Sequence, residues 1–158
     1  MGKARDRLDE VEYKWGLKCA VGFSRWRGSD KGWAGVWVAG FTRKLGKVNS
    51  FCAELWALRD GLFLCQQMNM TALIVELDAK ALVVVLTNPS YSNSIVSGLF
   101  DDCRQLLSVF PHCRVQHVFR EANTCTDQLA RLGSLQVFEF ILQSCPPVDI
   151  KNSFEANS

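Results

Sequence analysis

The printed sequence contains no pattern typical of a secretory signal, a lipid anchor or a membrane span. Its first fourteen residues, MGKARDRLDEVEYK, are charged where a secretory signal would be apolar. Asp6 occupies the position where an N-myristoylation motif needs Ser or Thr. No apolar run reaches the roughly 18 residues that a membrane span needs. We therefore expect a soluble intracellular protein that makes no use of a membrane, in the cytoplasm or the nucleus.

Motifs for zinc, disulfides and nucleotide phosphates are also missing. The seven cysteines form no C-x-x-C pair, and their odd number favours free thiols in a reducing compartment. The two histidines, His112 and His117, share no zinc-type spacing with any cysteine. Neither G-x-x-x-x-G-K-[ST] nor G-x-G-x-x-G occurs. The sequence thus favours neither a zinc site nor a phosphate-binding loop.

The composition is that of an ordinary globular domain. With 158 residues, 48% hydrophobic and 22% charged, the chain is long enough for one domain with a substantial core. The formal net charge is only +2, which neither indicates nor excludes a local basic face for nucleic acid. We find no internal repeat, so we expect a charged lead-in over 1–14, one domain over 15–140 and a loose tail over 141–158.

Apolar periodicity predicts a mixed α/β domain. Alternation with period 2 indicates strands, and the 3.6-residue period of the segment that starts at Ser50 indicates the clearest helix. Strands are expected over 17–23, 33–41, 72–77 and 114–119, and helices over 50–68, 79–86, 95–110 and 123–135. The polar stretch SRWRGSDKG (24–32) is expected to be a turn between the first two strands. This order predicts a mixed sheet with helices on its faces.

Three acidic residues stand in apolar or element-end positions, where an acid is costly unless something uses it. Glu54 lies beside the apolar stripe of the first helix, or it is a helix-start glutamate that the helix dipole favours. Asp78 directly follows the strand ALIVEL, and ligands of such sheets bind beyond the ends of strands. Alternatively, Asp78 caps the next helix. Asp127 lies in the first turn of the last helix, where with Thr124 it also matches a capping box.

Taken together, these carboxylates favour a metal site. Clustered carboxylates raise one another's pKa and destabilise a fold unless a cation joins them. Mg²⁺ prefers oxygen ligands, and two such ions about 4 Å apart can hydrolyse a phosphodiester. We therefore predict that Glu54, Asp78 and Asp127 are both catalytic residues and ligands of two Mg²⁺ ions, with Mn²⁺ as a substitute.

Three strings resemble the ribonuclease H-like domain of plant retroelement-derived proteins. They are AELWALRDGL (53–62), LIVELDAK (73–80) and VQHVFREANTCTDQLARLG (115–133), within a likeness that runs from residue 37 to 133. The resemblance implies a five-stranded mixed sheet flanked by helices, which binds an RNA/DNA hybrid and cuts its RNA strand with two Mg²⁺ ions. It assigns Glu54, Asp78 and Asp127 to the family's carboxylates. Asn123 falls at a polar residue beside the site and is equally a helix cap.

The chain departs from that family at its first carboxylate. The family has this aspartate at the end of the first strand, in a T-D-G-S-type turn, whereas Phe23 or Ser24 falls there in AVGFSRWRGSD (20–30). Asp30 could replace it only if its loop folds back. Roughly ten residues are missing by comparison, so we expect the sheet to lack one strand of its N-terminal meander. The lost aspartate would bridge both metals, and its absence should impair catalysis.

Three hypotheses follow from this departure. The first is a Mg²⁺-dependent endoribonuclease acting on RNA/DNA hybrids, and the second is a non-catalytic nucleic-acid-binding module. The third is a degenerate retroelement remnant. Aromatic and basic residues in the first forty positions could stack on bases and contact phosphates, but we favour the interpretation that the tryptophans fill the apolar face of the hairpin. These tryptophans are Trp15, Trp26, Trp33 and Trp37.

Overall fold

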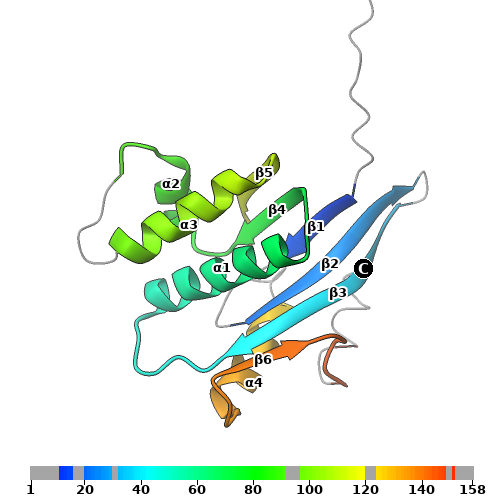
Figure 1. The fold of residues 1–158 in the computed structure, drawn as a ribbon. Helices are drawn as coiled ribbons and strands as arrows, with labels where there is room; N and C mark the ends of the chain where they lie inside the picture. Colours follow the sequence, from blue (N-terminus) through cyan, green and yellow to red (C-terminus); the bar gives the residue numbers. More distant parts are fainter. Residues whose placement is uncertain are drawn as a thin grey trace, which may run out of the picture.

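A six-stranded mixed sheet with helices on both faces forms the fold (Figure 1). The computed structural model describes residues 11–15, 20–29, 32–91, 97–119, 124–148 and 151, with side chains over 37–91, 98–119, 128–148 and 151. The strands are β1 (Val11–Trp15), β2 (Ala20–Ser29), β3 (Gly32–Arg43), β4 (Ala72–Leu77), β5 (His112–His117) and β6 (Phe140–Gln143). The helices are α1 (Ser50–Gln67), α2 (Lys80–Thr87), α3 (Ser97–Val109) and α4 (Thr124–Leu135).

The sheet has the order β5-β4-β1-β2-β3-β6. β1, β2, β3 and β6 pair antiparallel in that sequence, whereas β4 is parallel to both β1 and β5. This arrangement confirms the mixed α/β fold class that the sequence indicated. β1 thus joins an antiparallel half of the sheet to a parallel half. Because β1, β4 and β5 run parallel, their carboxyl ends lie at one edge of the sheet, where ligands of such sheets bind.

The N-terminal part of the sheet differs from the sequence-based expectation. Residues 11–15 form the central strand β1, although residues 1–14 were expected to be a charged lead-in outside the domain. Their alternation, with Val11, Tyr13 and Trp15 separated by charged residues, is the period-2 pattern of a strand and was the overlooked signal. The sheet therefore has a three-stranded meander and six strands in all, where five with one meander strand missing were expected.

The hairpin of β2 and β3 is confirmed, and it is longer than expected. β2 continues through Ser29, so most of SRWRGSDKG is strand and only residues 30 and 31 separate the two strands. Strand pairing over this length overrides the turn preference of the glycine and serine residues, because each added pair satisfies backbone groups along the ladder.

A β-bulge in β3 changes which face of the sheet Trp37 occupies. Phe23 of β2 pairs with Ala39, and the next residue of β2 pairs with Trp37. Val38 lies between these two positions and is therefore the additional residue of the bulge. Val38 and Phe41 pack against the core on the α1 face, whereas Trp37 packs against Leu129 of α4. In a regular strand Trp37 and Phe41 would share a face, and the bulge reverses that relation. Trp37 therefore has a packing role, and the other early tryptophans have side chains outside the described set.

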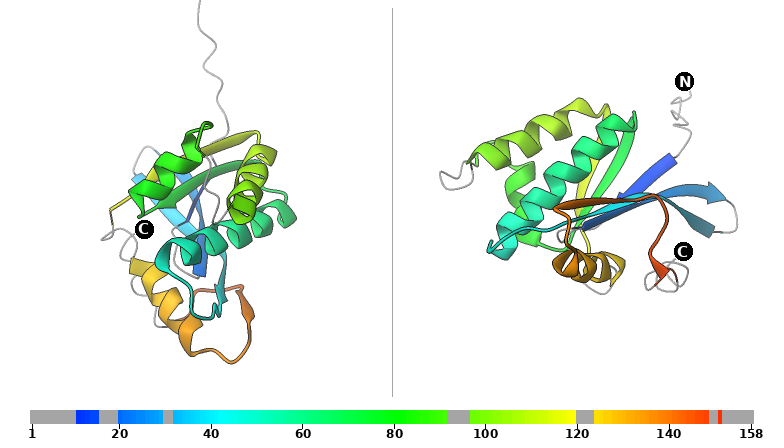
Figure 2. Two further views of the ribbon diagram at one scale, coloured as in Figure 1. Left: turned by 90° about the vertical axis from the view of Figure 1, so that its left-hand side faces the viewer. Right: turned by 60° about the horizontal axis from the view of Figure 1, so that its bottom comes forward.

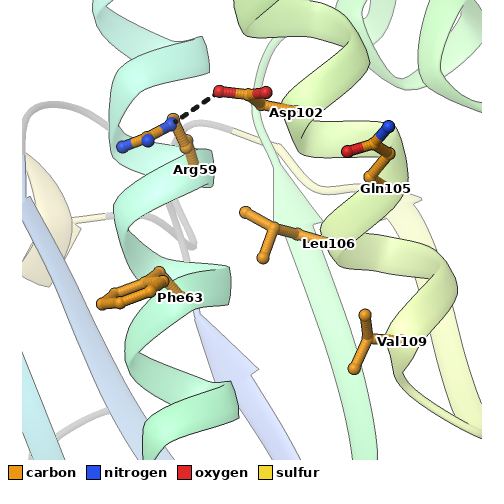
Figure 3. Close-up of a pocket in the computed structure, with 6 residues that line it drawn as sticks. All are labelled: Arg59, Phe63, Asp102, Gln105, Leu106 and Val109. Carbon is orange, nitrogen blue, oxygen red and sulfur yellow. Dashed lines mark hydrogen bonds and ion pairs between the residues drawn. The ribbon is translucent and has the colours of Figure 1, made fainter.

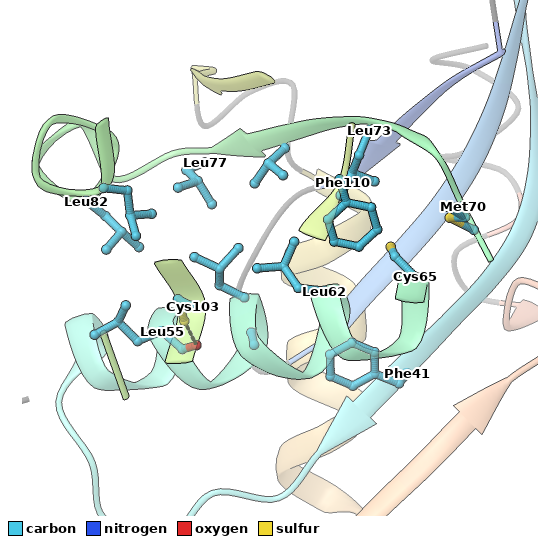
Figure 4. Close-up of a cluster of buried hydrophobic side chains, with 14 of the residues drawn as sticks. Phe41, Leu55, Leu62, Cys65, Met70, Leu73, Leu77, Leu82, Cys103 and Phe110 are labelled. Atoms are coloured by element: carbon cyan, nitrogen blue, oxygen red, sulfur yellow. Dashed lines mark hydrogen bonds between the residues drawn. The ribbon is translucent and has the colours of Figure 1, made fainter. Parts of the chain in front are cut away.

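Helices α1, α2 and α3 cover one face of the sheet, and α4 lies against the opposite face (Figure 2). The main core between α1, α3 and the sheet is apolar and close-packed (Figure 4). Its largest fully buried side chains are Phe41, Phe100, Leu55, Leu58, Leu62, Leu77 and Leu82. Among the described residues, no helix has the length and apolar character needed to cross a membrane.

The edge strand β6 is held in place by Gln136, which follows α4. Its amide nitrogen donates to the carbonyls of Thr42 (3.2 Å) and Phe138 (2.8 Å), and its carbonyl accepts from the Thr42 hydroxyl. The Phe140 ring then stacks on Phe41 with centroids 5.1 Å apart. These contacts explain why residues 140–143 form a strand at the border of the expected loose tail.

We expect the cysteines to differ sharply in reactivity. The five cysteines with described side chains are free thiols, as the odd count suggested. Cys65 and Cys103 are fully buried, and burial raises the pKa of Cys103 to about 12 and raises that of Cys65 as well. Because the thiolate is the reactive form, brief alkylation at neutral pH should modify exposed Cys145 and spare these two. Peptide mapping by mass spectrometry checks this. Modification of Cys103 as fast as that of Cys145 in the folded protein would contradict it, and all cysteines should react in denaturant.

Candidate carboxylate site

Asp78 lies in the bend between β4 and α2, at the carboxyl edge of the parallel strands. Its side chain is half-buried. The N-cap of α2 is Ala79, and no side chain caps that helix. The interpretation of Asp78 as a helix cap is therefore wrong. Its position beyond the strand end leaves a carboxylate at the place where mixed sheets bind ligands.

Glu54 is buried in α1, with 6% of its surface exposed. It is the fifth residue of the helix, and the first turn of α1 contains no acidic residue. The cap of α1 is Asn49, whose side chain accepts from the Cys52 amide at 2.8 Å, where Ser50 was expected. The helix-start interpretation of Glu54 is therefore wrong. A carboxylate this deeply buried is costly unless it is bonded or used.

The two carboxylates lie at the same end of the core. Figure 4 shows β4 running from Leu73 to Leu77 and α1 running the opposite way, from Leu55 to Cys65. The end of β4 and the beginning of α1 therefore face each other. Glu54 directly precedes Leu55, and Asp78 directly follows Leu77. The fold thus brings an acid from α1 and an acid from β4 to one end of the molecule.

The other two predicted residues are only partly covered by the structure. Asp127 lies in the first turn of α4, as expected, but its side chain is not among those described. Asn123 directly precedes α4 and lies outside the described part of the chain. Within the side chains that the structure describes, no group of three or more His, Cys, Asp or Glu residues could hold a metal ion. The structure therefore places two of the three predicted ligands.

β1 supplies no carboxylate beside Asp78. In the parallel pair, Lys14 lies next to Ile74 and Trp15 next to Val75. Glu12, the acidic residue of β1, is therefore beside the start of β4, at the opposite end from Asp78. Residues 16–19, which follow β1 in sequence, are Gly-Leu-Lys-Cys and include no acid. No acid of β1 therefore lies beside Asp78. The position expected for the lost aspartate was wrong, because Phe23 and Ser24 lie within β2 and not at the end of the first strand. Asp30, the alternative donor, lies outside the described residues.

His117 and Phe119 extend this edge, and sequence reasoning missed both. The Nε2 atom of His117 lies 3.2 Å from the backbone carbonyl oxygen of Asp78. The exposed Phe119 ring meets the His117 ring edge-on, with centroids 5.5 Å apart. From the sequence, His117 was considered only as a zinc ligand. The available signal was its place in the strand expected over 114–119, the next strand along the chain after the one that Asp78 follows.

A groove elsewhere on the molecule contains none of these carboxylates. It has a volume of about 290 Å³ and lies between α1 and α3 (Figure 3). The Arg59 guanidinium and the Asp102 carboxylate form an ion pair across it, with Nε and Oδ2 3.1 Å apart. Phe63 and Leu106 supply apolar walls. This ion pair joins the two helices, and the carboxylate site is a separate region.

Comparisons with known sequences agree with this architecture. A family model described as reverse transcriptase-like matches residues 31–133. A protein of Arabidopsis thaliana named a putative ribonuclease H protein is 30% identical to this chain over 96 residues. That alignment covers 61% of this chain and 16% of the Arabidopsis protein, so the chain spans only a small part of this relative.

Solved structures share the fold. The ribonuclease H1 of the archaeon Halobacterium salinarum superimposes with a TM-score of 0.62 at 21% identity, over 78% of this chain and 96% of the archaeal one. A ribonuclease H1 isolated from compost, crystallised with an RNA/DNA hybrid, gives 0.52 at 15% identity, over 78% and 95% of the chains. Because the family model covers well over half of the sequence, and the sheet and helices match these structures, this chain belongs to the reverse transcriptase-like family and has the ribonuclease H fold.

Proposed function

We propose that this domain binds RNA/DNA hybrids at the carboxylate edge and hydrolyses their RNA strand with Mg²⁺, at a rate reduced by the missing first-strand aspartate. The observation that carries the proposal is the placement of buried Glu54 and half-buried Asp78 at one end of α1 and β4. Two acids from distant parts of the sequence are brought to the edge where mixed sheets bind ligands. Neither has the helix-start or helix-cap role that could otherwise explain it.

The described donor set fits Mg²⁺. This ion is bound through one or two carboxylates, with waters and substrate phosphates completing its shell. Glu54 and Asp78 would supply those oxygens, and we propose Asp127 as a third ligand from α4, with Mn²⁺ as a substitute. When bound, such ions activate a water and stabilise the leaving oxygen of a phosphodiester. Without an acid on β1 next to Asp78, a second ion would be held weakly, and this is the reason to expect a slow enzyme.

Surface residues beside the carboxylates would contact the nucleic acid. Phe119 is 76% exposed and projects beside His117, next to Asp78. An exposed aromatic ring at such a position can stack on a base or a sugar whatever the sequence. We propose that Phe119 and Asn123 contact the hybrid at this edge. Contacts between basic side chains and phosphates would make the binding weaken as salt increases.

Asp78→Asn is the decisive variant for this function. The wild-type protein should bind an RNA/DNA hybrid and cleave its RNA strand in Mg²⁺ or Mn²⁺. Loss of a metal-binding charge should reduce cleavage at least about 100-fold while leaving the fold intact. Asp101→Asn is the matched control, because Asp101 is an exposed acid on α3 that is not among the proposed ligands. Cleavage that survives in Asp78→Asn at the rate of the Asp101→Asn control would count against the proposal.

A non-catalytic hybrid-binding module is the second candidate. The absence of an acid in β1 beside Asp78 favours it, because a two-metal mechanism uses a bridging carboxylate there. This candidate predicts salt-sensitive hybrid binding with no turnover in either metal. Fluorescence anisotropy with a labelled hybrid distinguishes the two. An absence of binding at low salt would exclude both candidates.

A further inference from the structure

The hydrogen-bond ladder between β4 and β5 ends one residue before Asp78. Its last backbone bond runs from the Val118 amide to the Leu77 carbonyl, at 2.9 Å. The next carbonyl along β4 belongs to Asp78, and it is bound by a side chain: the Nε2 atom of His117 lies 3.2 Å from it. The His117 ring thereby extends the connection between the two strands by one residue. That additional residue is the one that carries the carboxylate.

Chemistry determines the direction of this bond. A carbonyl oxygen only accepts, so the Nε2 atom of His117 must carry the hydrogen. A neutral ring therefore adopts the Nε2–H tautomer, and a protonated ring keeps the same donor. The edge-on Phe119 ring, 5.5 Å away, packs against the imidazole from the side. The bond is thus available in both protonation states, and the Phe119 ring contacts the imidazole that makes it.

We propose that His117 is a positioning residue of the carboxylate site. By holding the Asp78 carbonyl, its ring fixes the backbone of the bend between β4 and α2 and so sets the direction in which the Asp78 carboxylate points. The proposal rests on the proposed function for the role of that carboxylate. It goes beyond that function because His117 is not one of the proposed metal ligands. Its role is to orient Asp78, which is one of them. Partners of this kind that orient a ligand typically change metal affinity by a factor of 10–100 when removed.

Two substitutions of His117 separate the bond from the bulk of the ring. His117→Phe keeps an aromatic ring against Phe119 and removes the N–H donor. His117→Gln replaces the ring with an amide whose nitrogen can reach the same carbonyl. Gln116→Met is the matched control, because it removes a different hydrogen bond between the same strands, from Gln116 to Glu76 at 2.9 Å. That bond lies two residues before Asp78 on β4.

The first readout is independent of metal and activity. NMR of the folded wild-type chain should show the Nε2–H tautomer of His117 at neutral pH. Amide hydrogen exchange in residues 78–80 should be about tenfold faster in His117→Phe, and near the wild-type rate in His117→Gln and Gln116→Met. The Nδ1–H tautomer, or unchanged exchange in His117→Phe, would overturn the proposal. Equal acceleration in Gln116→Met would do the same, because it would show a general loosening of the strand pair.

The second readout links this bond to the site. Calorimetric titration with Mn²⁺ and with Mg²⁺ should give a dissociation constant about tenfold higher for His117→Phe, with His117→Gln within about twofold of wild type. An unaltered metal affinity in His117→Phe would overturn the proposal. If the wild-type chain binds neither metal, the proposed metal chemistry fails. The exchange experiment then decides separately whether His117 orders the Asp78 bend.

Discussion

Replacing Phe41 by alanine is expected to lower the free energy of unfolding by about 3–5 kcal/mol. Phe41 is fully buried on β3, within the main core. Its ring also stacks on Phe140 of β6, with an interplanar angle of 16°. The substitution therefore leaves a cavity under α1 and removes the aromatic contact that holds the edge strand. For a domain of this size the unfolding midpoint should fall by about 10 °C or more.

Thermal and urea denaturation, followed by circular dichroism, measure this effect. Phe63→Ala is the matched control, since it makes the same change at a side chain that is 53% exposed, and it should cost less than about 1 kcal/mol. Phe140→Ala should fall between the two, because Phe140 is 42% exposed and loses the stacking without leaving a core cavity. A Phe41→Ala variant as stable as Phe63→Ala would mean that the core is not packed as described.

The second large effect is expected at Asp60, an acid buried on α1. It is 7% exposed and pairs with Arg43 of β3, whose Nη2 lies 3.4 Å from Asp60 Oδ1 and whose Nε donates to Oδ2. The Arg43 guanidinium also lies over the Trp56 ring, 5.3 Å from its centroid. Asp60→Ala would leave this partly buried guanidinium without its acid, at a cost of about 3 kcal/mol. Because Arg43 retains some exposure to water, we place the cost at the low end for broken buried pairs.

Removing both charges should cost much less than removing one. Asp60→Leu combined with Arg43→Met replaces the pair with apolar side chains of similar size, and such replacements are often neutral or stabilising. Denaturant unfolding of the two single variants and the double variant gives the coupling between the residues. A double variant that loses as much stability as Asp60→Ala would show that Arg43 acts through contacts other than the pair.

The pH dependence of this region has a definite sign. Burial raises the pKa of Asp60 above its ordinary 3.8, although Arg43 and Arg59 both act to lower it. With the folded-state pKa above the unfolded one, the stability that Asp60 contributes is fully present below pH 3.8 and is lost as the pH rises through the folded-state value. The advantage of the wild type over Asp60→Asn should therefore shrink as the pH rises above 3.8 towards the folded-state pKa. A growing advantage over that range would contradict this assignment.

Elements with strong local signals could be predicted from the sequence. The apolar run ALIVEL matches β4 residue for residue, and the periodic segment from Ser50 matches α1 to within one residue. Their signals are strong because β4 is buried on both faces and α1 has a continuous apolar stripe. β1 and β6 were missed because each is short. β1 has a period-2 pattern inside a charged segment, and β6 depends on contacts made by Gln136 after the chain has turned back.

The candidate site was predictable only in part. Glu54 and Asp78 could be named from their motifs, because an acid beside an apolar stripe or after a buried strand is conspicuous in sequence. The sequence alone could not reject the alternatives, which were a helix-start role for Glu54 and a helix-cap role for Asp78. The cap of α1 falls on Asn49 and that of α2 on Ala79, and these positions depend on where each helix begins in space. His117 could not be assigned a role either, since its bond to Asp78 depends on the register of β5 against β4.

The sequence by itself determined the α/β class, the main helices and strands, and the acids that a site would use, because those features depend on neighbours within a few residues. The tertiary structure decided what depends on residues far apart. It inserted β1 between β2 and β4, turned Trp37 towards α4 through the bulge, and placed the His117 ring on the Asp78 carbonyl. The physical reason is that strand register and side-chain direction are set by pairing across the sheet. Short-range periodicity in the sequence does not indicate which strands pair or in which register.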